Sequence, residues 1–161
     1  MFYDRFQSSG YMTNWAARML ARAIDMRLKP IGMSSGYMPV MFALAHGAAL
    51  SQRALAEFAA IEQPTMAATL SRMERDGLIL RRPDPRDGRA WLYSLSETGL
   101  RKSVKVREGG REVNEAALSG MSPPEREAFL AALAKVVSNL ENFLDRQQKS
   151  AENDTEAADP D

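Results

Sequence analysis

The sequence contains no cysteine. Disulfides, thiolate metal ligands, cysteine nucleophiles and thiol-based redox sensing are therefore excluded, and a chain without thiols fits a reducing cytoplasm. The only histidine, His46, lies beside Gly47 and is more typical of a helix end than of a zinc site. No apolar run approaches the length of a membrane span, and the starting MFYDRFQSSG lacks the basic and apolar regions of a signal peptide. We expect a cytoplasmic protein.

Net charge is also absent, because 21 cations balance 21 carboxylates, but the charges are unevenly distributed. The final SAENDTEAADPD, from Ser150 on, holds five side-chain carboxylates and no cation, so residues 1–149 carry 21 cations against 16 carboxylates. Sixteen of the cations are arginine, the side chain best suited to phosphate and base edges. The body is therefore mildly basic, and we expect residues 149–161 to form a disordered acidic tail.

No pattern in the sequence favours catalysis. RDGR and REGG do not have the spacing of a phosphate-cradling loop. The carboxylates of Glu57, Glu62, Glu74 and Asp76 are typical of solvated helix charges and not of an acid–base pair. We therefore expect no enzyme, no cofactor and no metal.

Apolar spacing predicts a mainly helical chain with one small β-hairpin. Ser51 is expected to cap one helix, and Ser122, Pro123 and Glu125 to begin the last. The turn chemistry of PDPRDG joins the runs LILRR and WLYSL, and the return strand should turn Trp91, Tyr93 and Leu95 inward. Helices are expected at 10–29, 37–45, 51–60, 63–76, 97–118 and from 123 onward.

Two of these helices and the hairpin form a recognisable order. In the helix at 63–76, Met66, Leu70 and Met73 share one face, while small polar and arginine side chains face away. Such a helix suits the major groove, and a hairpin directly after it makes a helix-turn-helix with a wing. Arginines within 18 residues could track phosphates: Arg72, Arg75, Arg81, Arg82, Arg86 and Arg89. The alternative is that these arginines only keep the protein soluble.

The run LSQRALAEFAAIEQPTMAATLSRMERDGLILRRPDPRDGRAWLYSLSETGL resembles the MarR family of bacterial winged helix-turn-helix transcription regulators. The most specific part, DGLILRRPDPRDGRAWLYSLSETG, matches the family's wing pattern. The order of elements extends the likeness over residues 10–148. The resemblance implies a homodimer whose recognition helices enter successive major grooves of a pseudo-palindromic operator, while the wings reach the flanking minor grooves.

The resemblance also implies a domain plan and DNA-binding residues. An N-terminal arm and first dimerisation helix would occupy 1–30, the winged helix-turn-helix lobe 31–96, and the C-terminal dimerisation helices 97–148. Arg89 would enter the minor groove, Asp87 would brace it, and Arg86 would be a second cation of the tip. Glu62 departs from the family, which usually has Ser or Thr as the cap of the recognition helix. On that helix, Pro64, Thr65, Ala68 and Arg72 match groove-facing positions of the family, and Gln63, Thr69 and Arg75 are further candidate DNA-binding residues.

The apolar stripe of the first helix has two possible roles. Met12, Met19 and Met26 are seven apart, with Trp15 on the same stripe. They are either a core or dimer seam, or an adaptable pocket for a small apolar or aromatic effector. Because effectors of the family often bind between the dimerisation helices and the lobe, the candidate ligand residues are Trp15, Met19, Arg22, Tyr37, Met38 and Met41. The last helix needs a partner helix for Phe129, Leu133, Val136, Leu140, Phe143 and Leu144.

The sequence therefore predicts a DNA-binding transcription regulator, and we expect it to act as a repressor. It would bind a pseudo-palindromic operator as a homodimer and respond to a small molecule. The alternative is a protein-interaction module that retains the fold without specific DNA binding. Acidic groove-facing residues or a shortened wing would favour that alternative, and this sequence has neither.

Overall fold

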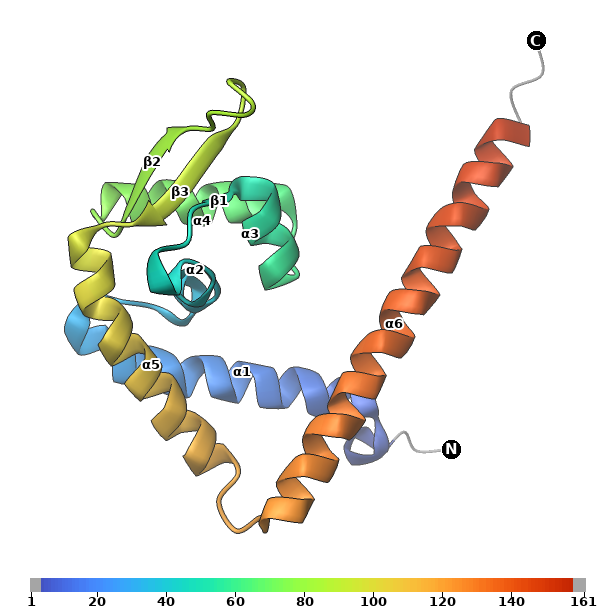
Figure 1. Cartoon of the computed structure of the whole chain (residues 1–161). Coiled ribbons are helices and arrows are strands. Elements are labelled where there is room, and N and C mark those ends of the chain that lie inside the picture. The colour runs from blue at the N-terminus through green and yellow to red at the C-terminus, as the bar shows by residue number, and fades with distance from the viewer. Residues whose placement is uncertain (1–3, 158–161) are drawn as a thin grey trace. The chain divides into compact units, whose positions relative to one another are not determined.

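The computed structural model describes residues 4–157, with side chains up to Ser150. The chain forms two compact units, Met1–Ala117 and Leu118–Asp161. The second unit holds one long helix, α6 (Pro123–Ala157). The first unit, drawn from blue to ochre in Figure 1, contains α1 (Ser9–Leu28), α2 (Met38–Ala43), α3 (Gln52–Ala59), α4 (Gln63–Arg75), α5 (Glu97–Ala117), β1 (Leu50–Ser51), β2 (Ile79–Pro83) and β3 (Trp91–Leu95). Short 3-10 turns lie at η1 (Arg5–Gln7), η2 (Lys29–Ile31), η3 (Ser35–Tyr37) and η4 (Ala45–Gly47).

The predicted fold class is confirmed: the chain is mainly helical with a small antiparallel sheet. The predicted helix starts are also found. The Ser51 hydroxyl accepts a hydrogen bond from the Ala54 N–H at 3.2 Å and caps α3. At the start of α6, the Glu125 carboxylate accepts hydrogen bonds at 2.7 Å from both the N–H and the hydroxyl of Ser122, which lower the pKa of Glu125.

The core of the first unit lies between the helices and the sheet. Every α-helix and β-strand from the end of α1 to α5 contributes to it, so the lobe is stabilised by burial of its own apolar side chains. The fully buried large side chains are Leu28, Val40, Met41, Leu44, Leu55, Met66, Leu70, Met73, Leu78, Ile79 and Val106.

The sheet has one strand more than the sequence predicts. Its order is β1-β3-β2, and the two-residue β1 pairs antiparallel with β3 through Leu50 and Tyr93. A strand of two residues has no periodicity to detect. Tyr93 and Leu95 are buried as expected, but Trp91 is 44% exposed. Trp91 pairs with Pro83 at the far end of the hairpin, and the Arg81 guanidinium covers its ring at 4.8 Å from the centroid.

The base of the hairpin is tied to both neighbouring helices. Gly77 ends α4 with φ 68°, a backbone conformation that favours glycine. The Ser96 hydroxyl donates to the Gly77 carbonyl at 2.7 Å and accepts from the Gly99 N–H at 3.0 Å. A Cβ at Gly99 would lie 2.1 Å from the Leu78 carbonyl oxygen, so only glycine allows this approach. These contacts fix where the hairpin leaves α4.

The end of the chain differs from the prediction. A disordered tail is expected from residue 149, but α6 continues to Ala157. Alanine and glutamate are good helix formers, and lengthening an existing helix requires no new nucleus, which corrects the expected boundary. Residues 158–161 of the expected tail lie outside the described residues. The division of the chain at residues 30, 96 and 148 by function stays a prediction.

Candidate nucleic-acid interface

Helix α4 has one buried and one exposed face, as its sequence predicts. Met66, Leu70 and Met73 are at most 1% exposed and hold the helix against the lobe. The candidate residues on the other face are exposed to solvent: Gln63, Pro64, Thr65, Ala68, Arg72 and Arg75. In Figure 1 the hairpin of β2 and β3 extends beyond α3 and α4. The exposed face of α4 and the hairpin tip therefore lie on the same lobe, with the tip projecting past the helices.

The start of α4 is held by a residue that the sequence did not single out. Glu62 occupies the cap position without a side-chain hydrogen bond, in line with its expected weakness as a cap. The Gln52 side-chain amide, at the start of α3, donates to the Gln63 side-chain oxygen at 3.1 Å. Gln52 therefore joins the first turns of both helices of the helix-turn-helix.

Thr69 is the one candidate of α4 that does not face outward. It is only 4% exposed, close to the values for Leu70 and Met73, so it lies on the inner side of the helix. Direct contact of the Thr69 side chain with DNA is therefore not available in this structure, which corrects the prediction. Its hydroxyl donates to the Thr65 carbonyl at 3.0 Å and accepts from the Arg72 guanidinium at 3.3 Å. Thr69 therefore contacts the Arg72 side chain and is not itself part of the exposed surface of α4.

The two arginines of α4 are both held by neighbours. Arg72 also donates from Nε to the Ala68 carbonyl at 3.2 Å. Arg75 donates from Nε to Asp76 Oδ1 at 3.1 Å, and the second oxygen of that carboxylate accepts a 2.8 Å hydrogen bond from the Tyr37 hydroxyl. The sequence predicts only a solvated charge at Asp76, since its partner Tyr37 lies 39 residues away and no local pattern signals it.

The hairpin tip is built by two aspartates acting in the same way. Asp84 Oδ1 accepts from the Arg86 backbone N–H at 2.9 Å, and Asp87 Oδ1 accepts from the Arg89 backbone N–H at 3.0 Å. Each is an Asx turn, which the repeated spacing of DPRDGR could have signalled for Asp84 as well. The expectation that Asp87 braces the Arg89 guanidinium is corrected: Asp87 holds the backbone of Arg89.

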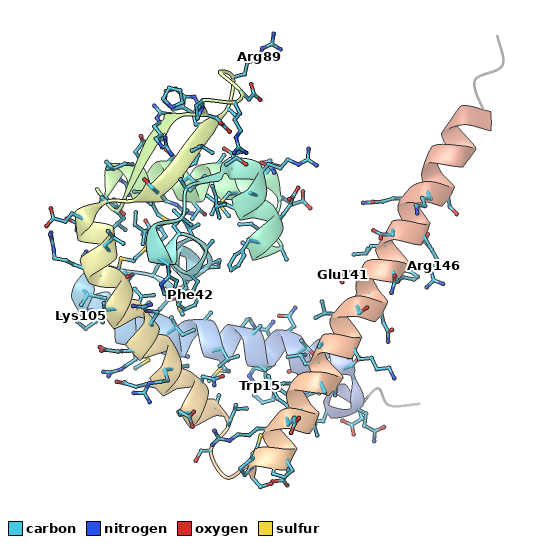
Figure 2. All side chains as sticks on the ribbon, in the orientation of Figure 1. Trp15, Phe42, Arg89, Lys105, Glu141 and Arg146 are labelled. Atoms are coloured by element: carbon cyan, nitrogen blue, oxygen red, sulfur yellow. The ribbon has the colours of Figure 1, made fainter. Side chains whose placement is uncertain are left out.

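The side chains of the tip are therefore open. Figure 2 shows Arg89 at the end of the hairpin with its side chain directed away from the lobe. Among the residues that the structure describes, the guanidinium groups of Arg82, Arg86 and Arg89 have no hydrogen-bond or ion-pair partner. Arg81 differs, because its Nε lies 3.0 Å from the Glu74 carboxylate and its guanidinium covers Trp91. It joins the hairpin to α4.

The six candidate ligand residues do not come together. Trp15, Met19 and Arg22 are exposed on α1, and Trp15 contacts Tyr11 and Phe6 with ring centroids 6.1 and 6.2 Å apart. Met38 and Met41 belong to the core, where a Cβ on Gly110 of α5 would lie 2.8 Å from Met38 Cε. Tyr37 is buried and bonded to Asp76. The structure thus places half of this set in the lobe core.

Two further findings concern metal binding and membrane-spanning helices. Among the side chains that the structure describes, no cluster of three or more His, Asp or Glu could hold a metal ion. No described helix combines the length and the apolar character needed to cross a membrane.

Known proteins share both the sequence and the fold. The model of the MarR family matches residues 31–90. The transcriptional regulator HosA of Escherichia coli O111:H- is 34% identical over 102 residues, which are 62% of this chain and 73% of HosA. The transcriptional repressor IacR of Pseudomonas putida is 26% identical over 87% of this chain and 86% of IacR.

Solved structures extend the likeness to most of the chain. The PcaV transcriptional regulator of Streptomyces coelicolor, in complex with its natural ligand, matches with a TM-score of 0.73 and 26% identity over 86% of this chain and 97% of PcaV. A probable transcriptional regulator of Pseudomonas aeruginosa matches with a TM-score of 0.75 and 26% identity over 83% of this chain and 99% of its own. From the α4 face, the Asx-turn wing and these matches, we conclude that the chain belongs to the MarR family of transcription regulators.

Proposed function

We propose that this protein regulates transcription by binding operator DNA as a homodimer, with α4 in the major groove and the hairpin tip in the minor groove. The observation that carries the proposal is the outer surface of the lobe. The exposed face of α4 presents Arg72 and Arg75, and the tip presents Arg86 and Arg89 beyond it. An α-helix fits the major groove, and an extended arginine fits a narrow minor groove.

The proposed dimer would bury the apolar side chains that α6 exposes on the single chain. Along α6 apolar side chains are exposed on the single chain, among them Val136, Leu140 and Phe143. Their spacing is that of a helix seam, and burying them in a second copy would remove this apolar surface from water. A two-fold dimer presents two α4 helices, which explains the expectation of a pseudo-palindromic operator.

We further propose that a small apolar or aromatic molecule weakens operator binding, so that the protein acts as a repressor in the cytoplasm. The relative IacR is named a repressor, and PcaV has been solved with its natural ligand. Since the chain has no cysteine, its response should be reversible binding and not a disulfide switch. Trp15, Met19 and Arg22 are the exposed candidates for such a ligand.

The experiment that tests DNA binding is a selection from random duplex DNA with the purified full chain. We expect an enriched pseudo-palindrome, bound tightly by the wild type. The doubly substituted Arg72→Ala, Arg89→Ala variant should fail to enrich it, because it lacks a major-groove and a minor-groove contact. Binding that is independent of sequence and lost with rising salt would instead favour the interaction module without specific DNA recognition.

The dimer has its own test. Leu140→Asp places a carboxylate in the proposed seam and should give monomers or unfolded chain in sedimentation. Ser138→Asp is the matched control, since two residues along a helix correspond to a rotation of about 200° and place the same charge on the opposite face. A Leu140→Asp protein that sediments as a folded dimer would remove α6 from the interface.

A further inference from the structure

The hydroxyl of a buried tyrosine reaches the end of the recognition helix. Tyr37 lies in η3, ahead of α2, and only 8% of it is exposed. Its hydroxyl donates to Asp76 Oδ2 at 2.8 Å, and Asp76 is the C-terminal cap of α4, with its backbone N–H bonded to the Arg72 carbonyl. A side chain from the core thus contacts the C-cap residue of the helix proposed to read DNA.

The same carboxylate holds an exposed arginine with its other oxygen. Asp76 Oδ1 lies 3.1 Å from both Nε and a terminal nitrogen of Arg75, whose side chain is 72% exposed. The order is therefore phenol, carboxylate, guanidinium. Because the phenol occupies Oδ2, Oδ1 is left facing Arg75, and rotation of the carboxylate would break both contacts.

The position of Asp76 makes this arrangement notable. The C-terminal end of a helix carries a partial negative charge, so a carboxylate there is disfavoured unless other groups compensate it. The hydrogen bond from Tyr37, followed by that from Arg75, lowers the pKa of Asp76. Burial, followed by the bond to Asp76, raises the pKa of Tyr37. At neutral pH the phenol is therefore a donor and the carboxylate an ionised acceptor.

The tyrosine itself is anchored from outside the recognition helix. The Ser35 backbone N–H, two residues before Tyr37, donates to Asp25 Oδ1 of α1 at 2.6 Å. The Tyr37 N–H donates to the Ser34 carbonyl at 3.1 Å. The phenol thus projects from a short turn that is itself bonded to α1, so its place does not depend on α4.

We propose that Tyr37 is a positioning residue for DNA binding, which fixes Asp76 and through it the direction of the Arg75 guanidinium. The inference rests on the proposed function, because it requires Arg75 to contact DNA. An arginine held in one rotamer before binding loses less conformational entropy when the complex forms. Removing the phenol hydroxyl should therefore weaken binding without removing any group that touches DNA.

The test is a double-mutant cycle on the operator selected with the wild-type protein. Tyr37→Phe keeps the ring and loses the hydroxyl, and we expect binding about threefold to tenfold weaker. In the Arg75→Ala background the same change should have no effect, because nothing is left to position. Tyr93→Phe is the matched control: within the described residues, the hydroxyl of this buried tyrosine makes no hydrogen bond, so affinity should be unchanged.

The cycle separates a positioning role of Tyr37 from a general structural one. An equal loss in both backgrounds would assign Tyr37 a general structural role and overturn the proposal, as would unchanged binding by Tyr37→Phe. If Tyr37→Phe does not fold, Asp76→Asn takes its place in the cycle. Asp76→Asn removes a negative charge near DNA, so tighter binding by that variant would overturn the proposal and weaker binding would support it. Failure of the wild type to select any sequence would refute the proposed function itself.

Discussion

The arginines of the recognition helix and those of the wing tip are prepared for DNA in different ways. Arg72 and Arg75 are each hydrogen-bonded before DNA is present, to Thr69 and the Ala68 carbonyl in one case and to Asp76 in the other. At the tip, Arg86 and Arg89 have backbones fixed by Asx turns, while their guanidinium groups have no partner within the described chain. The helix fixes the side chain, and the wing fixes only the backbone.

This difference matches the two kinds of recognition. A base edge in the major groove offers donors and acceptors at fixed places, so a guanidinium held in one direction can discriminate among bases. A minor groove is read largely by its width and its negative potential, which a mobile arginine can follow. The held arginines lose less conformational entropy on binding, and the open ones lose more but tolerate variation in the groove.

The largest effect should come from the open side of this comparison. Arg89→Ala removes the tip cation without removing a contact of the free protein, so we expect binding weaker by about 1–3 kcal/mol per subunit and an unchanged melting temperature. The slope of log K against log salt should fall by about one per subunit. Gel-shift titrations over a salt series measure both. Arg146→Ala on α6 is the control, and an equal loss by that variant would mean that net charge alone matters.

Asp87→Ala tests whether the fixed backbone of the tip matters. The change removes a negative charge from a surface that faces DNA, so simple electrostatics predicts tighter binding. If the Asx turn aims Arg89, losing it should instead weaken binding by up to about 1 kcal/mol, because the backbone order that a capping side chain supplies would have to be restored when DNA binds. The sign of the change in Kd therefore decides. Asp87→Asn, which keeps an oxygen acceptor for the Arg89 N–H, should restore most of the affinity.

Much of this arrangement could be predicted from local pattern. The helix-turn-helix, the inward face of α4 and the wing follow from apolar spacing, capping residues and turn chemistry, which act over a few residues. The resemblance to the family singles out Arg89 and Arg72, whose contact with DNA stays a prediction. The prediction that Trp91 is buried is wrong. Alternation along β3 predicts which face of the sheet a side chain lies on, but it does not show that Trp91 lies at the far end of the hairpin, where the lobe does not cover that face.

Contacts between distant segments could not be predicted in the same way. The sequence predicts a ligand residue at Tyr37 and a solvated charge at Asp76, although each is the partner of the other across 39 residues. It also predicts a DNA contact for Thr69, whereas the Thr69 hydroxyl is satisfied within the helix by the Thr65 carbonyl. The role of a polar side chain depends on which partner the fold brings to it, and a single sequence does not contain that information.

The smallest expected effect concerns the held side of the comparison. Thr69→Val has nearly the same shape and removes the hydroxyl that accepts from Arg72, while the bond from Arg72 to the Ala68 carbonyl can persist. We therefore expect operator binding weaker by only about 0.5–1 kcal/mol. The loss should be uneven over a panel of operator variants: discrimination should fall at the major-groove base that Arg72 contacts and stay unchanged at the minor-groove positions, because only the direction of Arg72 has changed. Thr69→Ser is the control, since it keeps the hydroxyl and removes a methyl group from the buried face. If both variants lose discrimination equally, packing of Thr69 and not its hydrogen bond holds Arg72. If neither does, Arg72 is as mobile in solution as Arg89, and the contrast between helix and wing does not contribute to recognition.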